Sequence, residues 1–380
     1  MAEPVQIYKG AIDKGLEGVV ACTTKISSIV DATLTYRGYV IEDLAENSSF
    51  EETSFLLWND RLPKKSELDQ LRRDIGAHQA LSPELITALK MIPTKGVHPM
   101  AWLRTAVSLA ATFDPRAQEE TPEANQNKAL NLVAKMGPLV AAFERIRTGK
   151  DILQAKPGQS ISWNFLYLLF GKEPDPQFVK VFDTALILHA DHELNCSAFS
   201  ARVTASSLSD IYSAVVSAIG ALKGPLHGGA NEQVMKMLKE IGNMEKARPW
   251  VKDALAGKKK VMGFGHRVYK NGDPRARILR AMSENLGKKI GEPHWYEMSV
   301  LIDDTMQNEK GLLPNVDFYS ASVYYCMGIP IDIYTPIFAV SRISGWLAHI
   351  FEQFSNNRIY RPRGDYIGQL NLKWTAPEKR

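Results

Sequence analysis

Three short segments of the chain carry the residues best suited to acid–base chemistry. His227 lies within the segment GPLHGGANE, His266 lies within GFGHRVYK, and Asp317 ends the segment PNVD. A carboxylate can remove a weakly acidic proton from carbon, and a histidine can hold or protonate an oxygen on which charge develops. Two potential proton donors and one carboxylate are the parts that an enolising condensation enzyme needs.

Each of these residues also has a simpler interpretation when it is taken alone. A histidine between glycines can be a turn residue with a satisfied hydrogen bond, and Asp317 can cap a helix that begins near Phe318. Gly263 and Gly265 suggest a dinucleotide-binding loop, but Val268 occupies the place of that fingerprint's third glycine. The spacing therefore does not indicate a dinucleotide site.

Taken together, the segments resemble the citrate synthase family. The segment GFGHRVYKNGDPR (263–275) fits the family pattern at every constrained position, and further matches extend over nearly the whole chain. They include LTYRGY (34–39), HADHELN (189–195) and YRP (360–362). The resemblance implies a mainly α, two-domain helical fold with a short N-terminal β-hairpin.

The resemblance also implies a reaction and a role for each residue. Asp317 takes the methyl proton of acetyl-CoA, His227 holds the enol oxygen, and His266 polarises and protonates the carbonyl of oxaloacetate. Citryl-CoA then forms and is hydrolysed in the same site, so that citrate and CoA are released. No metal or redox cofactor is expected.

A product with three carboxylates requires cations, preferably the two-pronged donors of arginine. The resemblance assigns these roles to Arg275, Arg342 and Arg361, joined by His192 and Asn195. In the family the arginine that matches Arg361 reaches the partner subunit's site, which implies an obligate homodimer.

CoA carries phosphates, which bind lysines and exposed backbone amides. A lysine triplet ending at Lys260 precedes the glycine-containing loop. We therefore expect CoA along Lys260, Val261, Met262, Gly263 and Phe264, with Lys258 and Lys270 as phosphate partners.

Several alternatives remain open from the residues. Cys196, where the family commonly has alanine, lies four residues after His192 and permits a thioesterase with a cysteine nucleophile. His189 and His192 lie one helical turn apart, but a zinc site needs a third ligand and no zinc motif is present. A binding protein without activity would be expected to have lost part of the polar set, which is retained.

The nearest competitor is 2-methylcitrate synthase, which uses propionyl-CoA through the same residues. An apolar pocket distinguishes one methylene by only about 1–3 kcal/mol. Asp191, where relatives of the methylcitrate type often have glutamate, and the pair Phe318-Tyr319 favour acetyl-CoA.

Composition agrees with an enzyme that acts on small anions. The chain has 380 residues and a net charge of 46 − 42 = +4, too modest and dispersed for a nucleic-acid-binding protein. Its three widely separated cysteines favour a reducing compartment. Neither an export signal nor an apolar run of membrane-spanning length occurs in the sequence, so we expect a cytoplasmic protein without a membrane partner.

Helical patterns punctuated by glycine and proline must position these residues. We predict helices from Ser82 to Pro93, from Ser160 to Gly171, from about Gln177 through His189, and from Ser209 through Leu222. Residues 23–39, rich in Thr, Ile and Val, predict a β-hairpin.

The resemblance further implies a large domain, 1–222 and 328–380 with a C-terminal arm, interrupted by a small domain, 223–327. The catalytic residues lie in or beside the small domain, whereas His192, Arg342 and Arg361 lie in the large one. We therefore expect oxaloacetate to close the two domains on each other.

Overall fold

A computed structural model describes residues 12–266, 268–269 and 272–380. It divides the chain into two compact units. One contains the terminal segments, up to Thr24 and from Ile359 to Arg380, and the other is the body, Lys25–Arg358. In the terminal unit, short 3-10 helices span Lys14–Leu16 and Pro377–Lys379, and the Tyr360 hydroxyl donates to the Ala21 carbonyl at 3.4 Å.

The body begins with a small antiparallel sheet of three strands, β1 (Ser27–Val30), β2 (Thr33–Tyr36) and β3 (Tyr39–Val40), in the order β1-β2-β3. Val30 pairs with Thr33 across a two-residue turn. Both turn residues, Asp31 and Ala32, have positive φ, which is the backbone form that matches the twist of a tight hairpin. The predicted hairpin is confirmed, and a short third strand extends it.

Apart from loops and turns, the described residues of the body otherwise form helices, so the mainly α prediction is confirmed. The helices of the first half are α1 (Ile41–Asn47), α2 (Phe50–Asn59), α3 (Lys65–His78), α4 (Pro83–Lys90), α5 (Pro99–Ala111), α6 (Pro122–Arg147), α7 (Ile161–Phe170) and α8 (Pro176–His189). Those of the second half are α9 (Cys196–Ser206), α10 (Ile211–Leu222), α11 (Ala230–Ile241), α12 (Met244–Ala256), α13 (Pro274–Ile290), α14 (His294–Lys310), α15 (Val316–Cys326) and α16 (Tyr334–Ser355), with a 3-10 turn at Ile331–Ile333 before the last.

Capping chemistry explains why the predicted helix limits were nearly right. The Ser82 hydroxyl accepts from the Leu85 N–H at the start of α4, and the Ser160 hydroxyl accepts from the Trp163 N–H at the start of α7. Helices α8 and α10 begin after aspartate caps, Asp175 and Asp210, within two residues of the predicted starts.

Helix α16 forms the centre of the body. Nearly all of its residues from Tyr334 to Ile350 are buried, because it packs against α2, α5, α6, α8, α9 and α10. A helix that is apolar on all sides must be surrounded in this way. Arg342 and His349 are thereby held inside the body rather than on its surface.

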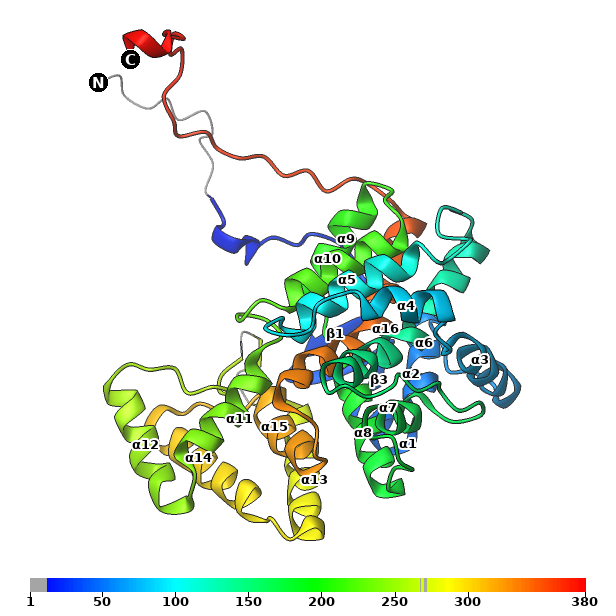
Figure 1. Cartoon of the computed structure of the whole chain (residues 1–380). Coiled ribbons are helices and arrows are strands. Elements are labelled where there is room, and N and C mark those ends of the chain that lie inside the picture. Colours follow the sequence, from blue (N-terminus) through cyan, green and yellow to red (C-terminus); the bar gives the residue numbers. More distant parts are fainter. Residues whose placement is uncertain (1–11, 267, 270–271) are drawn as a thin grey trace. The chain divides into compact units, whose positions relative to one another are not determined.

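Helices α11 to α15 pack mainly on one another and form a group of their own in the lower left of Figure 1. They meet the other helices through α1, α8 and α16. The predicted small domain, 223–327, spans these helices, and its boundaries stay a prediction. Among the described residues, no helix is both long and apolar enough to cross a membrane.

Candidate active site

One cavity of about 510 Å³ in the body brings most of the predicted site residues together. The lining residues named by the sequence are His192, Asn195, His227, Lys260, Met262, Gly263, Phe264, His266, Arg275, Asp317 and Arg342. These residues come from segments as far apart as 192 and 342, so the chain concentrates acid–base and cationic groups at one place.

The remaining predicted residues are distributed differently. The Lys258 side chain is exposed and Val261 is packed in the core, and neither lines this cavity. Arg361 is an exposed residue of the terminal unit. Lys270 lies outside the described residues.

Two loops pair with each other to place His266 and Asp317. The Gly265 N–H donates to the Leu313 carbonyl at 3.0 Å, and the Asn315 N–H donates to the Gly263 carbonyl at 2.9 Å. The Asn315 side chain also donates to the Gly265 carbonyl at 3.0 Å. Backbone pairing across these loops fixes the histidine of one beside the carboxylate that follows the other.

Gly263 is required at this junction for two reasons. Its φ is +82°, a conformation that favours glycine. A Cβ at this position would also lie 2.8 Å from Val234 Cγ2 and 2.9 Å from Phe318 Cβ. Any larger residue would therefore push the loop away from α15, whose first turn carries Asp317.

Asp317 lies in the first turn of α15 and does not cap it. Asn315 is the cap, since its side chain accepts from the Asp317 N–H at 3.0 Å, so the capping interpretation of Asp317 is wrong. Asp317 is 8% exposed, and within the described residues its Oδ1 has no hydrogen-bond partner. Burial raises the pKa of Asp317 to about 7 against the attraction of Arg275. A carboxylate in this state is well matched to abstract a proton near neutral pH.

His266 is held as a neutral donor. Its Nδ1 accepts from the Val268 N–H at 3.0 Å and from the Tyr269 N–H at 3.3 Å. The ring proton is therefore left on Nε2. Burial lowers the pKa of His266 to about 4, and the positive charge of Arg275 acts in the same direction. The imidazole can therefore donate to an oxygen in the cavity without first carrying a positive charge.

His227 is held in the opposite tautomer. Its Nε2 accepts from the Ser197 N–H at 3.3 Å and lies 2.8 Å from the Ser197 hydroxyl. The ring proton therefore resides on Nδ1. The same hydroxyl also accepts from the indole N–H of Trp346 at 3.0 Å. Burial lowers the pKa of His227 to about 4, assisted by the charge of Arg342. Trp346 and Ser197 thus orient a second neutral donor.

His192 packs edge-on against the His266 ring, with the ring centroids 5.1 Å apart. Its Nε2 lies 3.1 Å from the Tyr269 hydroxyl. Burial lowers the pKa of His192 well below its ordinary value, and the positive charge of Arg275 is the second contribution. Three neutral imidazoles therefore stand at this cavity.

Two buried arginines supply its positive charge. Arg275 is 2% exposed, and its guanidinium donates to both carboxylate oxygens of Asp273, at 2.9 and 2.8 Å. Burial alone would lower the pKa of Arg275, but the Asp273 carboxylate outweighs it and raises that pKa. Arg342 is 1% exposed and donates to the His189 carbonyl at 2.7 Å, and burial lowers its pKa to about 10. In the part of the chain that the structure describes, no carboxylate lies within 4.0 Å of Arg342.

Asp273 also joins two helices at the site. It caps α13 by accepting from the Arg275 N–H at 3.0 Å, and its other oxygen accepts from the Val316 N–H at 3.1 Å, at the start of α15. Burial would raise the pKa of Asp273, but Arg275 outweighs it and keeps the pKa below its ordinary value. One carboxylate therefore fixes Arg275 relative to the helix turn that carries Asp317.

Four helices begin at the cavity wall. Cys196 opens α9, Ala230 opens α11, Arg275 is in the first turn of α13, and Asp317 is in the first turn of α15. Helix N-termini carry partial positive charge and free N–H groups, which favour anions. The helix N-termini and the arginines therefore both favour a negatively charged ligand.

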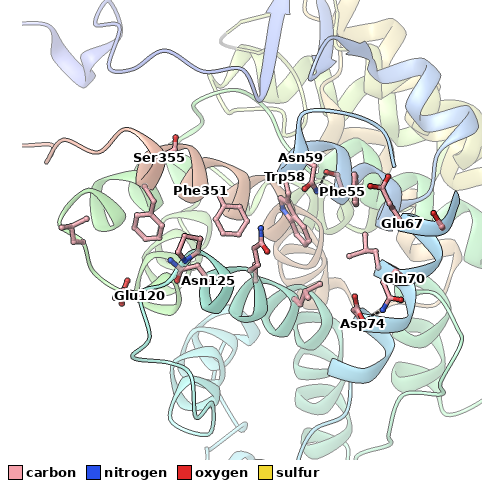
Figure 2. A pocket seen from close by; sticks show the side chains of 18 residues that line it. Phe55, Trp58, Asn59, Glu67, Gln70, Asp74, Glu120, Asn125, Phe351 and Ser355 are labelled. Atoms are coloured by element: carbon pink, nitrogen blue, oxygen red, sulfur yellow. Dashed lines mark hydrogen bonds between the residues drawn. The ribbon is translucent and has the colours of Figure 1, made fainter. Parts of the chain in front are cut away.

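A second cavity, of about 910 Å³, lies between α2, α3, α6 and α16 and has an apolar wall (Figure 2). Its aromatic lining includes Phe55, Trp58, Phe351 and Phe354. The charged residues among those that line it are Glu67, Asp74 and Glu120, and none is a histidine, lysine or arginine. Acidic side chains repel a substrate rich in carboxylates. The smaller cavity, which is lined by arginines, is therefore the better candidate for the active site.

Sequence reasoning missed Ser197, Asp273 and Tyr269 as residues that hold the site. Asp273 precedes a proline at the first position of a helix, a pattern typical of a capping residue. That pattern could have identified it. The contact of Ser197 with the His227 ring, 30 residues away in the sequence, has no local signal.

Comparison with known proteins agrees with this geometry. The family model "Citrate synthase, C-terminal domain" matches residues 15–363. The chain is 57% identical over 367 residues to citrate synthase 2 of Bacillus subtilis, covering 97% of this chain and 99% of that one. A 2-methylcitrate synthase of Mycobacterium tuberculosis is 42% identical over 370 residues, and the match covers 97% of this chain and 93% of that one.

Solved structures give the same result. Citrate synthase from Pyrobaculum aerophilum superimposes with a TM-score of 0.92 at 40% identity, covering 100% of this chain and 98% of that one. A ternary complex of Thermoplasma acidophilum citrate synthase with carboxymethyl coenzyme A and oxaloacetate has a TM-score of 0.91 at 32% identity, with coverages of 97% and 100%. The chain therefore belongs to the citrate synthase family, a family of acyltransferases.

Proposed function

We propose that this protein condenses acetyl-CoA with oxaloacetate and water to give citrate and CoA. One observation carries the proposal: a single cavity holds Asp317, whose pKa lies near neutrality, together with the neutral donors His227 and His266 and the buried cation Arg342. These are the base, the two oxygen donors and a carboxylate-binding group that the reaction requires.

In the first step, Asp317 removes a proton from the methyl carbon of acetyl-CoA. The Nδ1–H of His227 donates to the thioester oxygen and stabilises the enol as it forms. Removing one such donor typically lowers a rate about 100- to 1000-fold. Since His227 is neutral at pH 7, it can hold the enol without a change in its own protonation state.

In the second step, the enol carbon attacks the ketone carbon of oxaloacetate. The Nε2–H of His266 polarises the ketone and transfers its proton to the oxygen as the carbon–carbon bond forms. Water then attacks the thioester carbonyl of citryl-CoA and returns one proton to His266. The CoA thiolate leaves with the proton that Asp317 took from the methyl carbon, and the second proton of the water is lost to solvent as the new carboxyl group ionises. The side chains supply all the acid–base groups of these steps, so we propose that no cofactor takes part beyond the two substrates.

We propose that Arg275, Arg342 and Arg361 bind carboxylates, with His192 and Asn195 beside them. Arg342 supports this role because it is buried without an ion-pair partner among the described residues. Lys260 and the backbone from Met262 to Phe264 would hold CoA, with Lys258, Val261 and Lys270 as further candidates.

We further propose a homodimer in which Arg361 serves the site of the partner subunit. In the terminal unit, Ile367, Leu372 and Trp374 are 75%, 74% and 79% exposed. Large apolar side chains in one exposed segment favour burial against another chain.

Mixing two inactive variants tests this arrangement. If Arg361 acts across the dimer, hybrids of Arg361→Ala with Asp317→Asn contain one complete site, so activity should return after subunits exchange. If Arg361 acts within its own subunit, both sites of the hybrid are defective and the mixture stays inactive.

We also propose that residues 223–327 close on the rest of the body when oxaloacetate binds. Helices α11–α15 pack mainly on one another, which supports movement as a unit, and residues on both sides of this boundary line the cavity. Small-angle scattering should show compaction with saturating oxaloacetate, and an unchanged profile would contradict closure.

The free thiols of Cys22, Cys196 and Cys326 support a reducing compartment, and we propose the cytoplasm.

Release of CoA thiol from acetyl-CoA and from propionyl-CoA, with and without oxaloacetate, tests the function. We expect release that depends on oxaloacetate and a higher kcat/KM with acetyl-CoA. A higher kcat/KM with propionyl-CoA would indicate 2-methylcitrate synthase. Release of CoA thiol that does not depend on oxaloacetate would indicate a thioesterase.

A further inference from the structure

We infer that Cys196 is a redox modification site, at which CoA disulfide forms a mixed disulfide with the enzyme and blocks the active-site cavity. This inference rests on the proposed function, because it requires the cavity to bind the CoA moiety. The free thiol of the CoA class is the product of the proposed reaction, and its disulfide is the oxidised form of that product.

Cys196 is an exposed residue in the wall of the active-site cavity. It is the first residue of α9, its side chain is exposed, and it lines the same cavity as His227 and Asp317. The hydroxyl of the next residue, Ser197, lies 2.8 Å from His227 Nε2. If His227 holds the thioester oxygen, the sulfur of CoA is bonded to the same carbonyl carbon. Cys196 is therefore the chain neighbour of Ser197, the residue that contacts the proposed oxygen donor His227, and it lines the same cavity.

The cavity itself carries an independent sign of a ligand. Asp317 lines this cavity, and its Oδ1 is buried and has no hydrogen-bond partner within the described residues. An unpaired buried carboxylate oxygen is costly unless a ligand or proton meets it. The thiol thus stands in the wall of a binding cavity and not on an arbitrary surface.

The other two cysteines differ in ways that make the reaction selective. Cys326 is 5% exposed at the end of α15, and burial raises the pKa of its thiol to about 11. The thiolate is the attacking species, so Cys326 is both inaccessible and unreactive. Cys22 is half-buried and is not among the described residues that line this cavity.

The chemical step is thiol–disulfide exchange. The Cys196 thiolate attacks one sulfur of CoA disulfide, a bond forms between Cys196 Sγ and that sulfur, and the disulfide bond breaks. The second CoA leaves as a thiolate and takes up a proton. The protein thiol is oxidised and one CoA is reduced, so electrons balance, and an added thiol reverses the step.

The adduct should stop turnover because it occupies the space of the substrate. The cavity has a volume of about 510 Å³, and a covalently held CoA would exclude acetyl-CoA from it. Oxidation of the product thiol would in this way switch off the enzyme that releases it, and reduction would restore it.

The test compares CoA disulfide with glutathione disulfide, which lacks the nucleotide part. We expect CoA disulfide to inactivate the intact enzyme about tenfold faster or more, because binding holds the disulfide beside the thiol. The intact mass of the protein should increase by the mass of one CoA minus two hydrogen atoms. Peptide mapping should place the adduct on Cys196, and dithiothreitol should restore activity.

Matched variants separate the possible outcomes. Cys196→Ala and Cys196→Ser should keep oxaloacetate-dependent activity and resist CoA disulfide, whereas Cys22→Ala and Cys326→Ala should remain sensitive. An adduct on Cys22, equal rates with both disulfides, or full activity of the Cys196 adduct would overturn the inference. Loss of all activity in Cys196→Ala would instead contradict the proposed condensation, because it would make the thiol a nucleophile.

Discussion

Replacing Asp317 with asparagine should make the protein more stable while abolishing most of its activity. The carboxylate is buried in the first turn of α15, and burial raises its pKa from 3.8 to about 7. A base that is costly to ionise inside the protein contributes to catalysis and opposes folding at the same time. The amide of asparagine has nearly the same shape and no charge.

The sign of the effect follows from proton linkage. The folded-state pKa is above the unfolded value, so the folded chain binds this proton more tightly. The stability associated with it is fully present below about pH 4 and is lost progressively as pH rises to about 7. The full cost of ionisation is therefore present above pH 7, where native Asp317 is charged.

The magnitude follows from the size of the shift. A difference of about 3 pKa units corresponds to about 4 kcal/mol at pH 8. At about pH 5 only the unfolded chain is substantially ionised at this position, and the cost falls to about 2 kcal/mol. The advantage of Asp317→Asn over the wild type should thus grow by roughly 2 kcal/mol between these two conditions.

Urea unfolding at both pH values measures this difference, with protein concentration held constant because an oligomer's stability depends on it. Asp303→Asn is the matched control. Asp303 is also buried, but it accepts hydrogen bonds from Tyr319 at 2.7 Å and Gln307 at 2.9 Å. Its replacement should therefore destabilise by about 1–3 kcal/mol at both pH values. A pH-independent effect of Asp317→Asn would refute the reasoning, because it would mean that the native carboxyl does not titrate near neutrality. The activity of Asp317→Asn should fall about 100- to 10,000-fold.

Other residues of the site give three further expectations. Ser197→Ala should lower kcat about tenfold with little change in KM for oxaloacetate, because it removes the hydroxyl beside His227 Nε2 and leaves only the longer contact from the backbone N–H. His227→Ala should lower kcat about 100- to 1000-fold. Steady-state CoA release measures both, and equal activity of Ser197→Ala and wild type would remove Ser197 from its positioning role. The kcat/KM for acetyl-CoA should rise with pH through about 7, because Asp317 must lose its proton to act as the base, and a pH–rate profile that is flat from about pH 5 to 8 would contradict this assignment. Asp273→Asn should lower stability by about 3–5 kcal/mol, since it leaves buried Arg275 without its carboxylate, and thermal unfolding that is unchanged would show that the pair is dispensable.

Local chemistry made parts of the fold predictable. Serine followed by proline or by an apolar run indicated the starts of α4 and α7 to the residue, because the cap and the first turn are contiguous in the chain. The starts of α8 and α10 were less accurate because a neighbouring aspartate was the actual cap. The third strand was missed since it has only two residues.

The same limit applies to the catalytic carboxylate. From the sequence, Asp317 could equally have capped a helix, and only the structure shows that Asn315 takes this role. The local motif identified Asp317 as a candidate base. Its side chain is free of the capping role only because Asn315 accepts the hydrogen bond from the Asp317 N–H.

The sequence by itself determined which residue types stand in which motifs, and it therefore determined the family and the reaction class. It also placed glycine at position 263, where the positive φ and the approach of Phe318 leave no room for a side chain. Only the tertiary structure decided the protonation states. The pKa values of Asp317 and the histidines depend on burial and on Arg275 and Arg342, which are brought to one cavity from distant parts of the chain. Desolvation and charge act through space, so no local pattern could have given them.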